Sequence, residues 1–253
     1  MEVKMKRLVL PMSIIPALIC LLFLSCSRDN NCEDAHLWDY PVKPGMEEWK
    51  QFQSNEEMVK ACQIPKYLFP CLSTDELTDL CLQYPLLIDF YAFNNINNGL
   101  DKLFSDFNGI RELYKRRDVS SSLLKRYNEK IQNFFFLDSD ASDLEKGLFI
   151  ISVSTLEALL RCVETNDNEI LKEILTSLVE GYERKWALEY RDFFRGLPAQ
   201  TNFYSRAHII IKISPESLVR FSNGIQNAVF TLIDYIDEAT VDLVNELSYQ
   251  LIN

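Results

Sequence analysis

Glycine is scarce in this chain, and that scarcity limits the possible folds more than any other feature. Only 7 of the 253 residues are glycine. A β-sandwich or β-barrel needs many tight turns, and such turns favour glycine. A nucleotide-binding α/β fold needs a glycine-rich loop after a strand, and the sequence has neither G-x-G-x-x-G nor the P-loop pattern. The sequence therefore predicts an all-α fold, an irregular array or bundle of short to medium antiparallel helices.

Local signals predict where several of these helices begin and end. Three serines, Ser54, Ser73 and Ser142, are each followed three residues later by Glu. This spacing is the capping box, in which the serine oxygen accepts a backbone N–H and the Glu reaches back to the cap. Pro65 and Pro85 predict stops, because the residue before proline disfavours the helical conformation.

Longer apolar periodicities predict the remaining helices. We expect helices over 95–117, with a bend at Asn108-Gly109, over 120–131, from 142 to about 164, and over 167–194, with a stop at 195–198. Residues 209–211 are three isoleucines that a strand would also favour. A single strand would have no partner, so a buried helix is the preferred interpretation. Ser214-Pro215-Glu216 predicts another start, and apolar residues over 225–236 and 241–251 predict the last helices.

The first 26 residues have the order of a bacterial lipoprotein signal. Lys4, Lys6 and Arg7 precede a 17-residue apolar run that ends just before Ser25-Cys26. A basic head, an apolar segment and a small residue at the cut site define a signal peptide. We expect cleavage before Cys26 and lipid on that cysteine, which holds a protein on a membrane. The alternative is an uncleaved anchor, although a spanning helix needs about 20 apolar residues.

The residues around Cys26 resemble the lipobox of Bacteroidota lipoproteins, through Phe23-Leu24-Ser25-Cys26. Ser27 follows the cysteine, and the resemblance then implies transport to the outer membrane. Asp29, Glu33 and Asp34 faintly resemble the acidic tag for surface export. The periplasmic face and the cell surface both stay open.

The sequence divides into three segments. Residues 1–25 are the predicted signal peptide, 26–46 the lipid site and tether, and 47–253 the helical domain, with a possible sub-boundary at 137–142. The tether is polar and contains two prolines, which favours an extended chain. Trp38 or Tyr40 within it could dock on the domain.

The net charge of the chain limits the kinds of partner that it can bind. Residues 1–25 hold three of the 26 basic and one of the 37 acidic residues, so the mature part has 23 against 36 and a net charge of −13. This balance disfavours nucleic acid, which needs a basic face. Residues 111–130, however, carry a net charge of +4. The candidate partner-binding patch there comprises Lys115, Arg116, Arg117, Lys125 and Arg126. In the alternative interpretation, the acidic C-terminal helices cover it.

Five cysteines remain beyond Cys26, namely Cys32, Cys62, Cys71, Cys81 and Cys162. An odd number leaves at least one of them free. The bacterial envelope permits disulfides, and a pair among Cys62, Cys71 and Cys81 is one possibility. Burial as small apolar side chains is the favoured interpretation. No C-x-x-C occurs, and no metal or cofactor is predicted.

Catalytic patterns are weak throughout the sequence. Ser122 and Lys125 match S-x-x-K, but the companion motifs of penicillin-recognising enzymes are absent. His36 falls in the tether, and His208 beside an apolar run is predicted to be half-buried. Asp234, Asp237 and Glu238 share one turn and predict a solvated face.

Motifs within residues 47–118 resemble helical lipoproteins encoded in gut Bacteroidota. They are the W-x-x-F-x-S pattern from Trp49, Ile64-Pro65, Ser73-Thr74, C-L-x-Y-P from Cys81, Asn108–Leu113 and Lys115–Asp118. The resemblance implies no activity and no catalytic residue. We therefore expect a non-catalytic, envelope-anchored binding module, attached to the membrane through Cys26, whose partner could be another envelope protein. The alternative is an envelope hydrolase with a carboxylate pair that the sequence does not identify.

Overall fold

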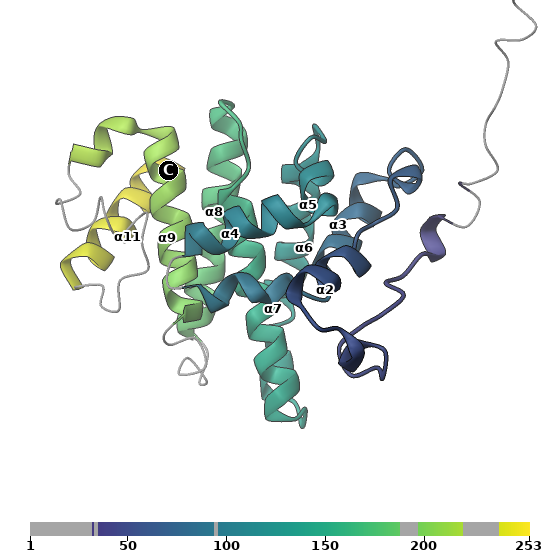
Figure 1. The fold of residues 1–253 in the computed structure, drawn as a ribbon. Coiled ribbons are helices and arrows are strands. Elements are labelled where there is room, and N and C mark those ends of the chain that lie inside the picture. Colours follow the sequence, from purple (N-terminus) through teal and green to yellow (C-terminus); the bar gives the residue numbers. More distant parts are fainter. Residues whose placement is uncertain (1–31, 33–34, 94–95, 188–196, 220–237) are drawn as a thin grey trace, which may run out of the picture.

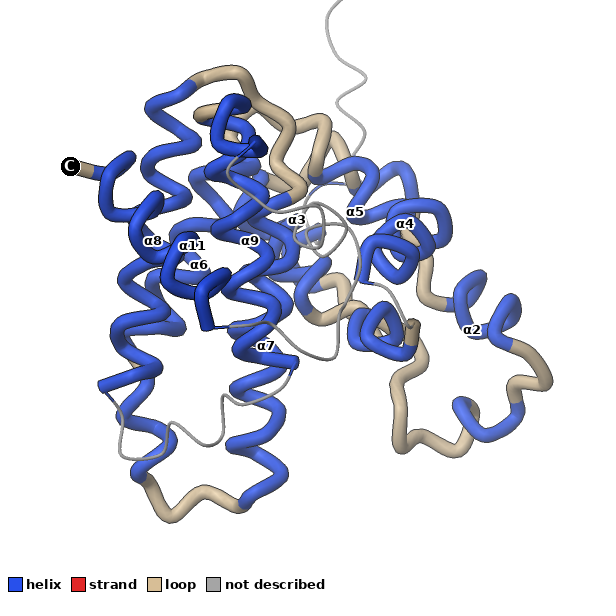
Figure 2. The backbone as a smooth tube through the Cα atoms, turned by 90° about the vertical axis from the view of Figure 1, so that its left-hand side faces the viewer, coloured by secondary structure: helices blue, strands red, loops and turns tan. Residues whose placement is uncertain are grey.

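The computed structural model describes residues 32, 35–93, 96–187, 197–219 and 238–253. Every regular element in these ranges is helical, which confirms the predicted all-α class (Figure 2). The α-helices are α2 (Asn55–Ala61), α3 (Thr74–Leu82), α4 (Ile96–Asp106), α5 (Asn108–Leu113), α6 (Val119–Gln132), α7 (Asp143–Arg161), α8 (Asn168–Ala187), α9 (Leu197–Ile213) and α11 (Glu238–Ile252). The 3-10 turns are η2 (Ala35–Leu37), η3 (Trp49–Gln51), η4 (Lys66–Leu68), η5 (Leu87–Ala92), η6 (Phe134–Asp138) and η8 (Pro215–Val219).

The helices are arranged along one direction of the molecule. Helices α2, α3 and α5 lie at the end where the N-terminal segment arrives, and α9 and α11 lie at the opposite end (Figure 1). Helix α9 packs against α7, α8 and α11, while α6 packs against α3, α7 and α8. Buried side chains from α3, α5, α6, α7, α8, α9 and α11 belong to one hydrophobic cluster, and α2 packs partly buried Met58 and Val59 against it. The residues on both sides of 137–142 therefore contribute to a common core.

The three predicted serine caps are present, two of them as complete capping boxes. Ser73 and Ser142 each accept a backbone N–H, from Glu76 and Glu145, and both Glu side chains return to the serine N–H, which completes the capping box. Ser54 accepts from the Glu57 N–H at 3.3 Å, but the Glu57 carboxylate accepts from Gln53 instead. The start of α2 therefore has the bond to the serine oxygen but not the return bond from Glu57 that would complete a capping box.

The predicted bend near Asn108 is a break between α4 and α5 at Phe107. Asn108 fixes it from the side, because its amide accepts from Ile64 N (3.0 Å) and donates to Ile64 O (2.7 Å). Gln63 adds a bond from Asn108 N, at 3.0 Å. The residues just before the predicted stop at Pro65 thus contact the predicted bend at Asn108 directly.

The isoleucines at 209–211 lie inside α9, so the preferred helical interpretation is confirmed. Leu197 and Pro198, which the sequence placed in a stop, are instead the first residues of α9. Proline is tolerated in a first helical turn, where the backbone N–H groups have no helical acceptor. Pro215 opens η8 as predicted. The predictions for 188–196 and 225–236 lie outside the described residues.

The segment before residue 47 is attached to the domain through Tyr40 and Cys32, among other residues. Tyr40 is buried, and its hydroxyl donates to the Leu80 carbonyl at 2.8 Å. Cys32 forms a disulfide with Cys71. The pairing considered among Cys62, Cys71 and Cys81 is wrong, because Cys71 bonds outside that group. Cys62 and Cys81 are free and buried, which confirms the favoured interpretation for these two.

Candidate functional site

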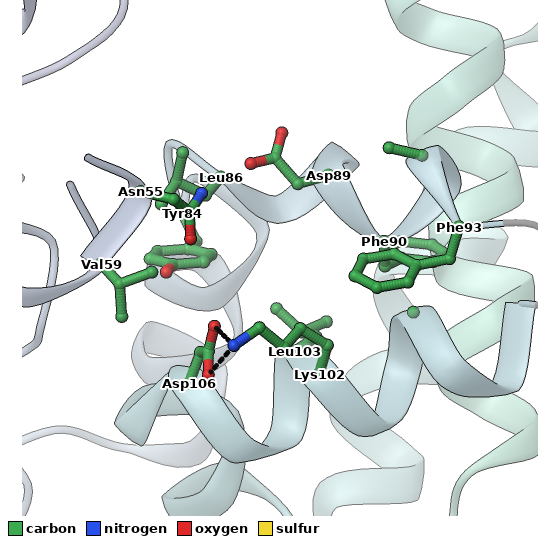
Figure 3. Close-up of a pocket in the computed structure, with 12 residues that line it drawn as sticks. Asn55, Val59, Tyr84, Leu86, Asp89, Phe90, Phe93, Lys102, Leu103 and Asp106 are labelled. Atoms are coloured by element: carbon green, nitrogen blue, oxygen red, sulfur yellow. Dashed lines mark hydrogen bonds and ion pairs between the residues drawn. The ribbon is translucent and has the colours of Figure 1, made fainter. Parts of the chain in front are cut away.

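A pocket of about 410 Å³ lies between α2, the segment 84–93 and α4 (Figure 3). Most of its wall is apolar and aromatic, from Val59, Tyr84, Leu86, Phe90, Phe93 and Leu103. The polar lining groups belong to Asn55, Asp89, Lys102 and Asp106. An apolar concavity with a few polar groups is the usual form of a ligand site.

Close backbone packing shapes one side of this pocket. Gly99 on α4 faces the Phe90 carbonyl so closely that a Cβ atom there would lie 2.0 Å from its oxygen. Only glycine therefore allows α4 to approach η5 this closely. Elsewhere in the pocket, Tyr84 stacks on Phe107, with ring centroids 3.8 Å apart. Both constraints hold the apolar wall in a defined position.

The three charged groups of the pocket differ in their partners. Lys102 Nζ lies 2.9 Å from one Asp106 oxygen and 3.0 Å from the other. Ser105 also donates to Asp106, at 2.9 Å. Within the described part of the chain, the Asp89 carboxylate has neither a hydrogen bond nor an ion pair. Burial among its neighbours raises the pKa of Asp89. The unpaired charge of the pocket is therefore a single carboxylate.

The lining offers both apolar and polar groups to a ligand. It contains no serine, threonine, cysteine or histidine, and its chemically reactive side chains are Lys102 and the carboxylates of Asp89 and Asp106. The described residues also form no group of three His, Cys, Asp or Glu side chains placed to hold a metal ion. An apolar group could fill the pocket, and a cation beside it could pair with Asp89.

A second hollow, of about 460 Å³, lies where η6 meets the start of α7. It includes Phe136, which packs on Phe149 at 5.4 Å, and Leu148, which is 52% exposed. Phe134, two residues earlier, is buried. Phe134 thus contributes a core side chain, and Phe136 forms one wall of a shallow surface depression.

Sequence reasoning missed a buried polar cluster in the second half of the chain. Glu157 is fully buried, and its Oε1 accepts from Tyr127 (2.8 Å), Lys185 (2.6 Å) and Asn202 (2.8 Å). Burial lowers the pKa of Lys185. Arg206 extends the cluster through Asn202 Oδ1 at 2.9 Å, and burial lowers its pKa to about 10. These groups contact one another and are shielded from solvent, so they hold helices together.

The structure separates the five residues of the candidate patch. Lys125 and Arg126 on α6 pair with Asp75 and Asp79 of α3, and the Arg126 contacts are 2.5 and 2.7 Å. Apart from Glu129 on α6 itself, their acidic partners among the described residues are on α3 and not on α11, the described C-terminal helix that the alternative interpretation would have placed there. The reason is that α6 packs against α3. Ser122 of the S-x-x-K pattern also donates to Asp75, at 2.6 Å, so it joins two helices.

The other three patch residues are close to the α5–α6 connection. Arg116 donates to the carbonyls of Phe69 (2.6 Å) and Leu72 (3.4 Å). Lys115 is 72% exposed, and its one ion pair with a described residue is a 3.3 Å contact to Glu112. Arg117 is exposed, and no ion pair to another described residue involves it. Lys115, Arg117 and Lys125 are thus the exposed members of the patch, and Lys125 pairs with Asp75 of α3.

The remaining predicted positions take no part in the pocket. His36 is exposed in η2, and His208 is half-buried on α9, as predicted. Burial, together with Lys212 and Arg161, lowers the pKa of His208 to about 4. Glu238 is the first residue of α11. Cys26, Asp234 and Asp237 lie outside the described residues.

The comparisons with known proteins identify no relative of this chain: no family model, no curated protein and no solved structure matches it. A search of the described residues finds no helix with the length and apolarity needed to span a bilayer.

Proposed function

We propose that this protein is an outer-membrane lipoprotein, attached through lipid on Cys26, whose helical domain binds another envelope protein without catalysing a reaction. The observation that carries the binding role is the pocket between α2, η5 and α4. It combines apolar walls with an unpaired carboxylate, and no serine, threonine, cysteine or histidine lines it. The fitting partner is a polypeptide segment that presents an apolar side chain beside a Lys or Arg.

The disulfide supports the envelope part of the proposal. Disulfides persist in oxidising compartments and are rare in the cytosol. The Cys32–Cys71 bond is therefore the kind of crosslink expected after export. Together with the basic head, apolar run and Ser25-Cys26, it favours an exported chain over a cytosolic one.

Anchoring has a direct test in growing cells. Wild-type protein should incorporate radiolabelled palmitate and sediment with outer membranes, and Cys26→Ala should abolish both. Labelled and processed Cys26→Ala protein would contradict the lipid assignment.

Binding is tested by crosslinking in intact cells followed by mass spectrometry. Asp89→Arg should remove the partner, because it places a cation where the partner's cation is expected. Asp101→Arg is the matched control, since Asp101 is exposed on α4, the helix on the other side of the pocket, but does not line the pocket. Equal capture of one partner by both variants would exclude this pocket as the binding site.

The same pocket also supports a second candidate function. Asp89 and Asp106 lie on its η5 and α4 sides (Figure 3), and glycoside hydrolases use two carboxylates across a cleft. Lys102 and Ser105 already engage Asp106, which favours binding. The two functions differ in one readout: polysaccharide turnover that Asp89→Asn and Asp106→Asn each abolish would establish the hydrolase.

A further inference from the structure

The Cys32–Cys71 disulfide lies six residues beyond the proposed lipid site, Cys26. Six residues span at most about 20 Å in any conformation. A domain of this length is roughly 40 Å across. The connection is therefore shorter than the domain. If Cys26 is lipidated, the side of the domain that carries Cys71 must be the side nearest the membrane.

Two exposed basic side chains are held close to Cys71. Arg116 bonds the carbonyls of Phe69 and Leu72, which places the α5–α6 connection next to the disulfide. Thr74 donates to Asp118 at 2.7 Å and fixes the other side of that connection. Lys115 and Arg117 are thereby held near Cys71 with exposed side chains.

Exposed apolar and aromatic groups border the same surface. Tyr67 is 59% exposed on η4, next to exposed Lys66, and Leu37 is 69% exposed on η2. Tyrosine is enriched at membrane interfaces, because its ring is apolar and its hydroxyl is polar. Lysine and arginine extend their charges to the lipid headgroups in the same layer.

We propose that Leu37, Lys66, Tyr67, Lys115 and Arg117 form a membrane-facing surface that rests on anionic lipid headgroups. This inference depends on the lipid anchor proposed above. Acidic side chains also adjoin this surface, and each contacts a neighbour: Glu112 pairs with Lys115, Asp118 accepts from Thr74, and Glu76 accepts from Ser73. The acidic α11 helix lies at the opposite end of the molecule (Figure 1). An anionic bilayer should repel α11 and attract this surface, and both effects favour the same orientation of the domain.

The test uses the full lipidated protein in vesicles of phosphatidylethanolamine and phosphatidylglycerol at a ratio of about 3:1. Amine-reactive labelling read by mass spectrometry reports the accessibility of each lysine. Lys66 and Lys115 should label about fivefold more slowly in vesicles than in the protein released by proteolysis near Cys26. Lys172, exposed on α8, is the internal control and should label equally in both.

Two variants separate the short connection from the lipid itself. Inserting ten Gly/Ser residues between Cys26 and Cys32 keeps the lipid and the disulfide but should remove most of the protection of Lys66. Arg117→Glu should also weaken that protection, by about fivefold, and should leave the circular dichroism spectrum unchanged because Arg117 is exposed. Replacing the anionic vesicles with phosphatidylcholine vesicles should weaken the protection of Lys66 to the same extent.

The outcomes distinguish this inference from the proposed anchoring. Absence of lipid on Cys26 would overturn both. Lipidated, vesicle-bound protein in which Lys66 and Lys115 label as fast as Lys172 would overturn the membrane-facing surface alone. Protection that survives the ten-residue insertion and phosphatidylcholine vesicles would also overturn it, because neither the short connection nor anionic lipid would then be the cause.

Discussion

Helix α6 contacts its neighbours on two sides, and on each side a carboxylate lies between the helices. One of these contacts is exposed to solvent and the other is buried. Toward α3, Lys125 and Arg126 pair with Asp75 and Asp79, and the Lys125 side chain is 53% exposed. Toward α7 and α8, Tyr127 donates to fully buried Glu157, which also pairs with Lys185. We call the first contact the α3–α6 seam and the second the Glu157 cluster.

The difference shows that solvent exposure determines how much a charge pair contributes to stability. Exposed pairs contribute about 0–1 kcal/mol, because water already solvates both partners and salt screens them. Removing one member of a buried pair costs about 3–5 kcal/mol, because the other charge stays in a medium that solvates it poorly. The seam should therefore contribute little to the stability of the fold, and the Glu157 cluster should contribute much more.

The largest expected effect is that of Glu157→Gln, which keeps the shape of the side chain and removes its charge. Lys185 would remain buried opposite a neutral amide. We expect a loss of about 3 kcal/mol or more in the free energy of unfolding, measured by urea denaturation. Glu157→Leu combined with Lys185→Met should lose less than the single variant, since neither member of the pair then keeps a buried charge. A double variant that is less stable than Glu157→Gln would contradict the argument.

A packing variant tests the same cluster without altering a charge. Gly181 on α8 lies so close to Tyr127 that a Cβ atom would fall 1.9 Å from its hydroxyl oxygen. Gly181→Ala should displace that hydroxyl from Glu157 and cost about 2–3 kcal/mol through overpacking and a lost hydrogen bond.

Gly147→Ala on α7 is the matched control, because nothing lies within 4 Å of the added atom. It should stabilise the protein by up to about 1 kcal/mol, since alanine favours the helix. Equal thermal denaturation midpoints for the two variants would show that Tyr127 is free to move.

The seam and the cluster also differ in how far the sequence predicts them. Ser73 and Ser142 were identified as helix starts because a capping box is local. The basic segment was visible as a charge pattern, but charge alone does not show that Asp75 and Asp79 would be its partners. Glu157, Lys185 and Asn202 gave no signal, because they come from three helices and Glu157 is one of 36 acidic residues in the mature part.

The pocket was unpredictable for a similar reason. Asp89 and Asp106 are separated by a helix, and the packing that joins them depends on the contact of Gly99 with the Phe90 carbonyl. Cys32 and Cys71 are 39 residues apart. A single sequence specifies these long-range contacts only through the whole fold, whereas the helical class follows from glycine scarcity and periodicity alone.

A third prediction concerns pH, and involves His208 at the α9 side of the core. The pKa of His208 is lowered to about 4 in the folded protein, from about 6.5 in an unfolded chain. The unfolded state therefore binds more protons between these values, and stability falls as pH decreases from about 6.5 toward 4. We expect a loss of about 2 kcal/mol between pH 7 and pH 5, measured by urea denaturation. His208→Gln should remove this part of the pH dependence, and an unchanged slope would contradict the assignment.

The smallest expected effect is that of Asp79→Asn in the α3–α6 seam. It removes the paired contacts to Arg126 at 2.5 and 2.7 Å, but the Asp79 side chain is 44% exposed and Arg126 keeps Glu129 at 3.5 Å. Urea denaturation at low salt should show a loss of about 1 kcal/mol or less, and 1 M NaCl should reduce it further through screening. A loss near that of Glu157→Gln, unaffected by salt, would mean that the seam is shielded from solvent. Exposure would then no longer explain why the two faces of α6 differ.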